Sequence, residues 1–95
     1  MIVERAEFTI AEADAEKFEA AYAQARELLA QTEGFGWAHM HRGIERPGSY
    51  LLIVGWESLE AHTVNFRESD RFPQWRALIG PYFAADPKVE HYREV

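Results

Sequence analysis

The N-terminal third of the chain has the hydropathy pattern of a strand followed by a helix. Polar and apolar residues alternate over residues 2–10, and one face carries Ile2, Glu4, Ala6, Phe8 and Ile10. Apolar residues then recur at spacings of three and four, namely at Phe18, Tyr22, Ala25 and Leu29. This predicts an amphipathic helix over residues 14–32, with Asp14 as its N-cap and Gly34 directly after its end.

Two extended segments follow, residues 36–46 and 49–57, and the turn dipeptide Pro47-Gly48 separates them. A β-hairpin is therefore expected. Residues 50–56 of its second arm are apolar at almost every position, so this strand is expected to be covered on both faces.

The remaining chain predicts two more helices and a last strand. We expect helices over residues 58–67, with Ser58 as the cap, and over residues 70–83, with a break or kink at Gly80-Pro81. Residues 88–95 are β-like. The order β-α-β-β-α-(α)-β indicates an α+β, ferredoxin-like βαββαβ fold in one domain over residues 1–95. Its antiparallel sheet has helices on one face only.

The other face of this sheet is expected to carry apolar side chains that no helix covers. Leu51 and Ile53 point there, with Trp37 beside them, because Leu52 and Val54 take the helix side. A second copy of the chain is the simplest cover, and the sequence therefore predicts a homodimer.

Composition narrows the class of protein. The 95 residues include 47% hydrophobic and 27% charged residues, a net charge of −6 and no Cys. The net negative charge argues against binding to the phosphate backbone of nucleic acids. The lack of Cys excludes thiolate chemistry and iron–sulfur clusters. Neither a signal peptide nor a transmembrane run is recognisable, so a cytoplasmic protein is expected.

Two groups of residues are candidates for a site. His62 lies in the apolar stripe of the second helix and is either a general base in a pocket or a buried histidine with one structural partner. Aromatic residues of the third strand and later helices either form ordinary core or line a cavity for a flat aromatic ligand. They are Trp56, Phe66, Phe72, Trp75, Tyr82 and Phe83.

Histidines on two strands are the candidates for a metal site. His39 and His41 share one face of a strand, and His91 on the last strand could add a third imidazole. No Asp, Glu or Cys accompanies them at a ligand spacing, so no metal is expected. Nucleotide, flavin and nicotinamide motifs are absent as well, and no organic cofactor is expected.

Residues 50–62, which read YLLIVGWESLEAH, with the Phe66-to-Ser69 run, Phe72 and Trp75 resemble the antibiotic biosynthesis monooxygenase (ABM) domain family. The resemblance implies a dimeric α+β barrel. The family includes monooxygenases that oxidise polycyclic phenols with O₂ and neither metal nor flavin, and also haem-degrading members. The haem-degrading branch relies on an Asn in its first strand, where this chain has Glu7 and no Asn, which counts against haem.

The resemblance adds residue roles. Trp56 matches the strand-end Trp of the family, whereas many members place a His where Asn65 stands here, so His62 is offset by one turn. The hypothesis is a cofactor-independent oxidation of a small aromatic phenol or hydroquinone. His62 would be the base, Trp56 and Trp75 stacking walls with Phe66 beside them, and Tyr82 or Asn65 a hydrogen-bond partner of the ring oxygen. The alternative is a non-catalytic dimeric module that binds a small aromatic metabolite or is purely structural.

Overall fold

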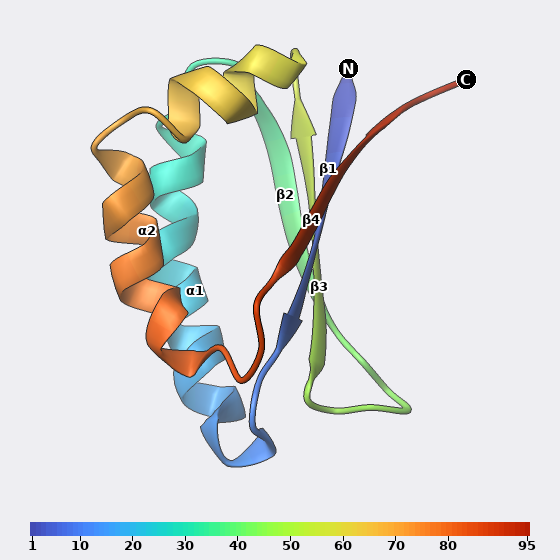
Figure 1. Ribbon diagram of the computed structural model, residues 1–95, viewed down its shortest axis with the longest axis vertical. Coiled ribbons are helices and arrows are strands. Elements are labelled where there is room, and N and C mark those ends of the chain that lie inside the picture. Colours follow the sequence, from blue (N-terminus) through green and yellow to red (C-terminus); the bar gives the residue numbers. More distant parts are fainter.

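The computed structural model describes residues 1–95 as one four-stranded antiparallel sheet with all helices on one face (Figure 1). The strands are β1 (Ile2–Thr9), β2 (Phe35–Arg42), β3 (Ser49–Trp56) and β4 (Lys88–Arg93). Their order in the sheet is β2-β3-β1-β4, so β1 and β3 are central. This arrangement confirms the predicted ferredoxin-like α+β fold.

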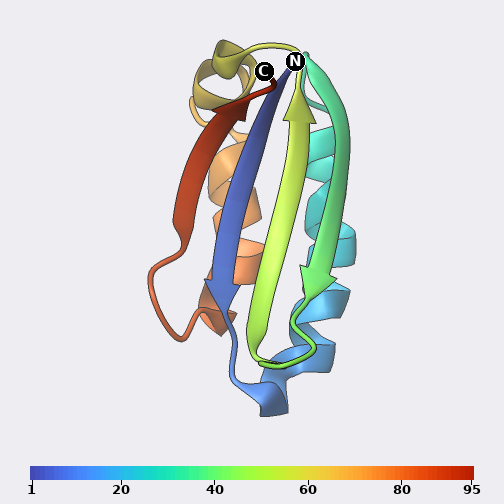
Figure 2. The same cartoon turned by 90° about the vertical axis from the view of Figure 1, so that its right-hand side faces the viewer.

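The helical layer consists of α1 (Ala15–Ala30), α2 (Arg71–Ile79) and three short helical segments. The short segments are the 3₁₀ turns η1 (Glu12–Asp14) and η3 (Gly80–Tyr82) and the π-helical turn η2 (Ala61–Phe66). In Figure 2 the sheet faces the viewer, the helices lie behind it, and both termini meet at one end. No helix is long and apolar enough to cross a membrane.

The hydrophobic core lies between the sheet and the helices, as the alternation of β1 predicts. Ala6, Phe8 and Ile10 are buried there, and Leu52 and Val54 join them from β3. Glu4 is also buried on this face, at 6% exposure. The side chains of Leu51 and Ile53 point to the opposite face, which carries no helix.

Helix ends differ from expectation where local hydrogen bonding decides them. Asp14 does occupy the N-cap position of α1, but its side chain makes no capping hydrogen bond because the preceding η1 turn gives it φ −100° and ψ 1°. Ser58 does cap, since its Oγ accepts a hydrogen bond from the Ala61 amide at 3.2 Å. The segment expected as a helix over residues 58–67 is mostly π-helical. The Arg67 amide donates a hydrogen bond to the carbonyl of His62, five residues earlier, at 3.0 Å.

Two other predicted elements are shorter than expected. The first arm of the hairpin ends at Arg42 rather than at residue 46, because residues 43–48 form the turn region. The helix expected over residues 70–83 ends at Ile79, and the residues around Pro81 form the separate 3₁₀ turn η3. Proline removes the backbone donor that would continue the helix.

Gly34 connects α1 to β2 in a conformation that only glycine adopts easily. Its φ is +92°, and a Cβ there would lie 2.6 Å from the Cβ of Ala61 in η2. We expect Gly34→Ala to lower the free energy of unfolding by about 2–4 kcal/mol, because alanine is strained at this positive φ and because its Cβ would collide with Ala61. Urea unfolding measures this. Glu33→Ala, on the neighbouring exposed side chain, is the control and should stay within about 0.5 kcal/mol of wild type; equal effects in both variants would contradict the prediction.

Candidate functional site

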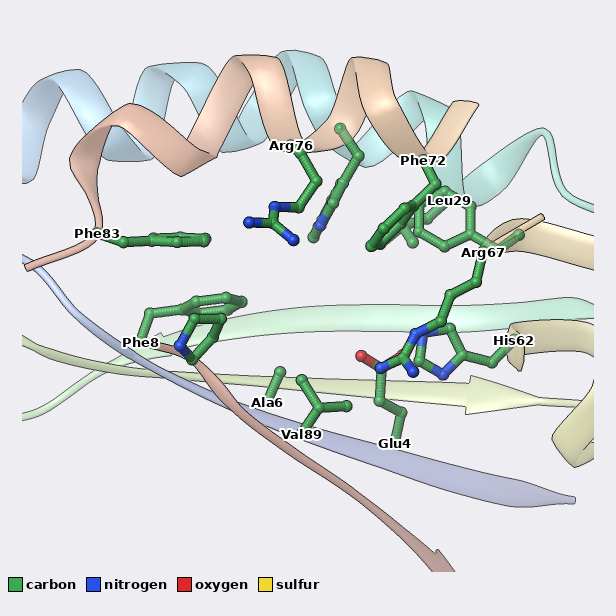
Figure 3. Close-up of a pocket in the computed structure, with 13 residues that line it drawn as sticks. Glu4, Ala6, Phe8, Leu29, His62, Arg67, Phe72, Arg76, Phe83 and Val89 are labelled. Carbon is green, nitrogen blue, oxygen red and sulfur yellow. The ribbon is translucent and has the colours of Figure 1, made fainter. Parts of the chain in front are cut away.

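A cavity of about 470 Å³ opens between the helical layer and the sheet (Figure 3). Five aromatic rings from β1, η2, α2 and the segment after α2 form one part of its wall. The rings are those of Phe8, Phe66, Phe72, Trp75 and Phe83. Several stand edge to face, with Phe66 at 5.7 Å from Phe72 and at 5.9 Å from Trp75 between ring centroids. This is the shape and lining of a pocket for an apolar, flat molecule.

The other end of the cavity is polar and is formed by Glu4, His62 and Arg67. The antiparallel topology brings these residues together. Glu4 is near the start of β1, and η2 follows the end of β3, and both lie at the end of the sheet where the termini meet. A carboxyl, an imidazole and a guanidinium thus adjoin the aromatic wall.

Two side chains contact the carboxyl group of Glu4. The Trp56 indole Nε1 donates a hydrogen bond to Glu4 Oε1 at 2.9 Å, and His62 Nε2 lies 3.4 Å from the same oxygen. Burial raises the pKa of Glu4, although the Trp56 hydrogen bond and the nearby charge of Arg67 oppose that increase. The carboxyl is therefore a better proton acceptor than an exposed glutamate.

His62 is enclosed on every side. Its ring stacks on Trp56 at 5.3 Å between centroids, and its Nδ1 lies 2.7 Å from Nε2 of His91 on β4. Burial, followed by the charges of Arg67 and His91, lowers the pKa of His62 to about 3. His62 is therefore neutral at pH 7, and its contact with Glu4 is a polar contact of a neutral imidazole rather than an ion pair.

Two arginines line the cavity without an acidic partner. The ion pairs of the chain involve Arg5 and Arg42, and neither Arg67 nor Arg76 belongs to one. The Arg76 guanidinium lies 6.0 Å from the Phe72 ring centroid. Both cations are thus available to a negatively charged group of a ligand.

The structure brings some of the sequence candidates to the cavity and leaves others outside it. His62, Phe66 and Trp75 line it, while Trp56 lies behind His62 and acts on Glu4. Asn65 is exposed and donates its amide to the Glu33 carbonyl at 3.0 Å. Tyr82 packs toward Phe18 at 6.4 Å between rings, because η3 turns it away from the cavity.

The histidines considered as metal ligands do not meet. His39 and His41 pair with Ile53 and Leu51 and face the helix-free side of the sheet, whereas His91 pairs with Glu4 on the helix side. No group of three His, Cys, Asp or Glu side chains is arranged to hold a metal ion.

Sequence reasoning missed Glu4 and Arg67 as site residues and considered His91 only as a metal ligand. A signal for Glu4 was present, because it is the one charged residue on the apolar face of the first strand. Arg67 and His91 carry no comparable signal, since their place depends on the π-helical turn and on the β1–β4 register.

A family model for antibiotic biosynthesis monooxygenases matches residues 1–78. This chain belongs to the ABM family. The YczJ protein of Bacillus subtilis (strain 168), which is itself uncharacterized, is 35% identical over the full length of both chains.

Solved structures of ABM proteins agree with this assignment. A protein from Bordetella bronchiseptica that is named for the family is 40% identical, with a TM-score of 0.94 over 99% of this chain and 96% of that one. A monooxygenase from the gene ActVA-Orf6 of Streptomyces coelicolor, solved in complex with nanaomycin D, is 22% identical, with a TM-score of 0.85 over 99% of this chain and 87% of its own. The second likeness shows the shared fold.

The lowered pKa of His62 predicts a pH dependence of stability. The unfolded chain binds a proton at this histidine below about pH 6.5 and the folded chain only near pH 3, so the free energy of unfolding should fall as the pH drops through this interval. The slope from this one group is up to about 1.4 kcal/mol per pH unit. Urea unfolding at several pH values should show that slope in wild type and lose it in His62→Gln.

His41→Gln is the matched control, because His41 is exposed on the other face of the sheet. It should keep the wild-type slope. Parallel curves for wild type and His62→Gln would contradict the prediction.

Proposed function

We propose that this ABM protein is a cofactor-independent monooxygenase that oxidises a small aromatic phenol or hydroquinone with O₂. The observation that carries the proposal is the cavity itself, in which an aromatic wall adjoins a buried carboxyl, a neutral imidazole and an unpaired guanidinium. The Streptomyces coelicolor monooxygenase of the same fold was solved in complex with nanaomycin D, which supports a small organic ligand for this protein too.

The chemistry requires an electron-rich substrate, because without a metal or flavin the electrons that reduce O₂ come from the substrate. Removing the hydroxyl proton of a phenol makes its ring a better electron donor. In a phenol with a hydrogen on the ring carbon opposite the hydroxyl, one oxygen atom then enters that carbon, and the other leaves as water with the hydroxyl hydrogen and the hydrogen of that carbon. In a hydroquinone the oxygen atom enters a ring carbon that carries hydrogen and becomes a new hydroxyl, and the other leaves as water with the two original hydroxyl hydrogens. The product is a quinone, and the atoms balance.

The residues around the cavity fit these steps. Phe66 and Trp75 would hold the flat ring, and Arg67 would favour the phenolate over the phenol by its charge. His62 is the candidate base from the sequence, and one nitrogen of its neutral ring can accept a proton. Burial lowers the pKa of His62, which makes it a weaker base than an exposed histidine. The enclosing side chains would limit access of water to the anion.

The activity test follows O₂ uptake and quinone absorbance with a panel of anthrones and hydroquinones. We expect uptake above background with wild type and a loss of about a hundredfold in His62→Ala, the size typical for losing acid–base catalysis. His41→Ala, on the far face of the sheet, should behave as wild type. Tight binding with no O₂ consumption would instead favour the non-catalytic module that binds an aromatic metabolite.

We also propose that a second copy of the chain covers the helix-free face of the sheet. The side chains there include Val3, Trp37, Leu51, Ile53 and Tyr92, and Trp37 lies across Gly55, whose absent Cβ leaves room for the indole. Val3, Trp37 and Tyr92 lie in one row near the end of the sheet where the termini meet, on the face without any helix. A symmetric copy would bury the same residues on both chains.

Sedimentation velocity tests the dimer. Wild type should sediment as a species of twice the 11.0 kDa chain mass at micromolar concentration. Ile53→Lys should shift it to the monomer, because it places a charge in the middle of the buried face. Val64→Lys is the matched control, since Val64 is 44% exposed on the helical side; a monomeric wild type would contradict the proposal.

A further inference from the structure

Three ionisable side chains form an unbroken chain from the cavity to the edge of the sheet. Glu4 Oε1 lies 3.4 Å from His62 Nε2, and His62 Nδ1 lies 2.7 Å from His91 Nε2. Glu4 lines the cavity, whereas His91 is partly exposed on the edge strand β4. The contact between the two histidines has the length of a hydrogen bond, whereas the 3.4 Å between Glu4 and His62 is longer than an ordinary one and must shorten for a proton to pass.

The two ends of this chain face different surroundings. Figure 3 shows the Glu4 side chain rising from β1 toward the helices, beside Arg67 and His62. Trp56 and His62 both approach Oε1, which leaves Oε2 for a ligand in the cavity. Burying a carboxyl on the helix side of a strand is unfavourable unless the carboxyl is fully paired.

We infer that Glu4 accepts the hydroxyl proton of the substrate, and that His62 and His91 relay it between Glu4 and solvent at the edge of β4. The inference rests on the proposed phenol oxidation and assigns the first acceptor to Glu4 rather than to His62. Trp56 is a positioning residue, because its indole holds Glu4 Oε1 and reaches no substrate.

The transfer balances without a further reactant. The substrate O–H breaks and Glu4 gains the proton, which leaves a phenolate beside Arg67. A half-turn of the Glu4 carboxyl carries the proton from the ligand side to the side of His62. Glu4 then passes it to His62 Nε2 while His62 Nδ1 gives its own proton to His91 Nε2, and His91 Nδ1 releases one to solvent. The later formation of water takes a proton back along the same path, which restores the starting protonation of both histidines.

The electrostatics of the residues around the path require that the proton pass through both histidines in one concerted step, in which neither imidazole becomes a stable cation. Burial raises the pKa of Glu4, and burial together with the charge of Arg67 lowers the pKa of both histidines. Neither histidine therefore retains a proton for long. The proton moves from a buried acceptor toward water.

The test uses alizarin, a hydroxyanthraquinone whose visible absorbance reports whether its hydroxyl is ionised. It is already a quinone, so the experiment needs neither O₂ nor turnover. At a pH below the pKa of free alizarin, wild type should bind it in the ionised form, and Glu4→Gln should bind it protonated. The Gln side chain keeps an oxygen for the Trp56 donor, and circular dichroism verifies that the variant is folded.

The relay is tested by proton release after mixing, followed in stopped flow with a fluorescent pH indicator. His91→Gln should bind ionised alizarin but release the proton at least about tenfold more slowly than wild type, and added imidazole should restore the rate. A purely structural role of His91 would not be rescued by imidazole. His41→Gln should release the proton at the wild-type rate.

Three results would overturn the inference. The first is that alizarin does not bind to wild type, or binds and stays protonated. The second is that alizarin ionises on Glu4→Gln as fully as on wild type. The third is that His91→Gln releases the proton slowly and that imidazole does not restore the rate. These results are distinct from a failure of the proposed oxidation, which would show as ionised alizarin and a working relay in a protein that consumes no O₂ with any phenol.

Discussion

Glu4 is a carboxyl buried on the helix-covered face of a sheet, and this burial demands polar partners from the surrounding elements. The partners come from the end of β3, where Trp56 donates to the carboxyl, and from η2, where His62 approaches it. Without either partner the carboxyl would be destabilising at its position. The polar end of the cavity therefore depends on how β1, β3 and η2 meet at one end of the sheet.

The aromatic part of the cavity has a different origin. Aromatic rings, fused or single, are wide and rigid. In a chain of 95 residues, the helical layer cannot pack all of its rings tightly against one another and against the sheet. Phe66, Phe72 and Trp75 pack edge to face and leave a space rather than a filled core. The same packing that stabilises α2 and η2 thus creates room for a flat molecule next to an acid–base group.

The two faces of the sheet have the two separate roles that we propose. One face carries the cavity and the Glu4–His62–His91 chain, and the other carries Trp37, Ile53 and their neighbours, which a second copy would cover. Because strand residues alternate between the faces, adjacent positions in a strand serve different roles. Glu4 lies in the site, whereas Val3 and Arg5 on either side of it do not. His91 and Tyr92 are separated in the same way on β4.

The sequence by itself determined the order of elements, the faces of β1 and β3, the inward position of His62 and the family, because all of these follow from local periodicity and from motifs within short segments. It did not determine the composition of the site. Asn65 lies outside the cavity because η2 closes as a π-helical turn, and Tyr82 does so because it ends the 3₁₀ turn that begins at Gly80. Both had been expected at the ring oxygen. Glu4 and His91 lie near opposite ends of the chain and become neighbours only through the pairing of β1 with β4. Strand register and the geometry of short helical turns are properties of the packed molecule, so only the tertiary structure decided which side chains share the cavity.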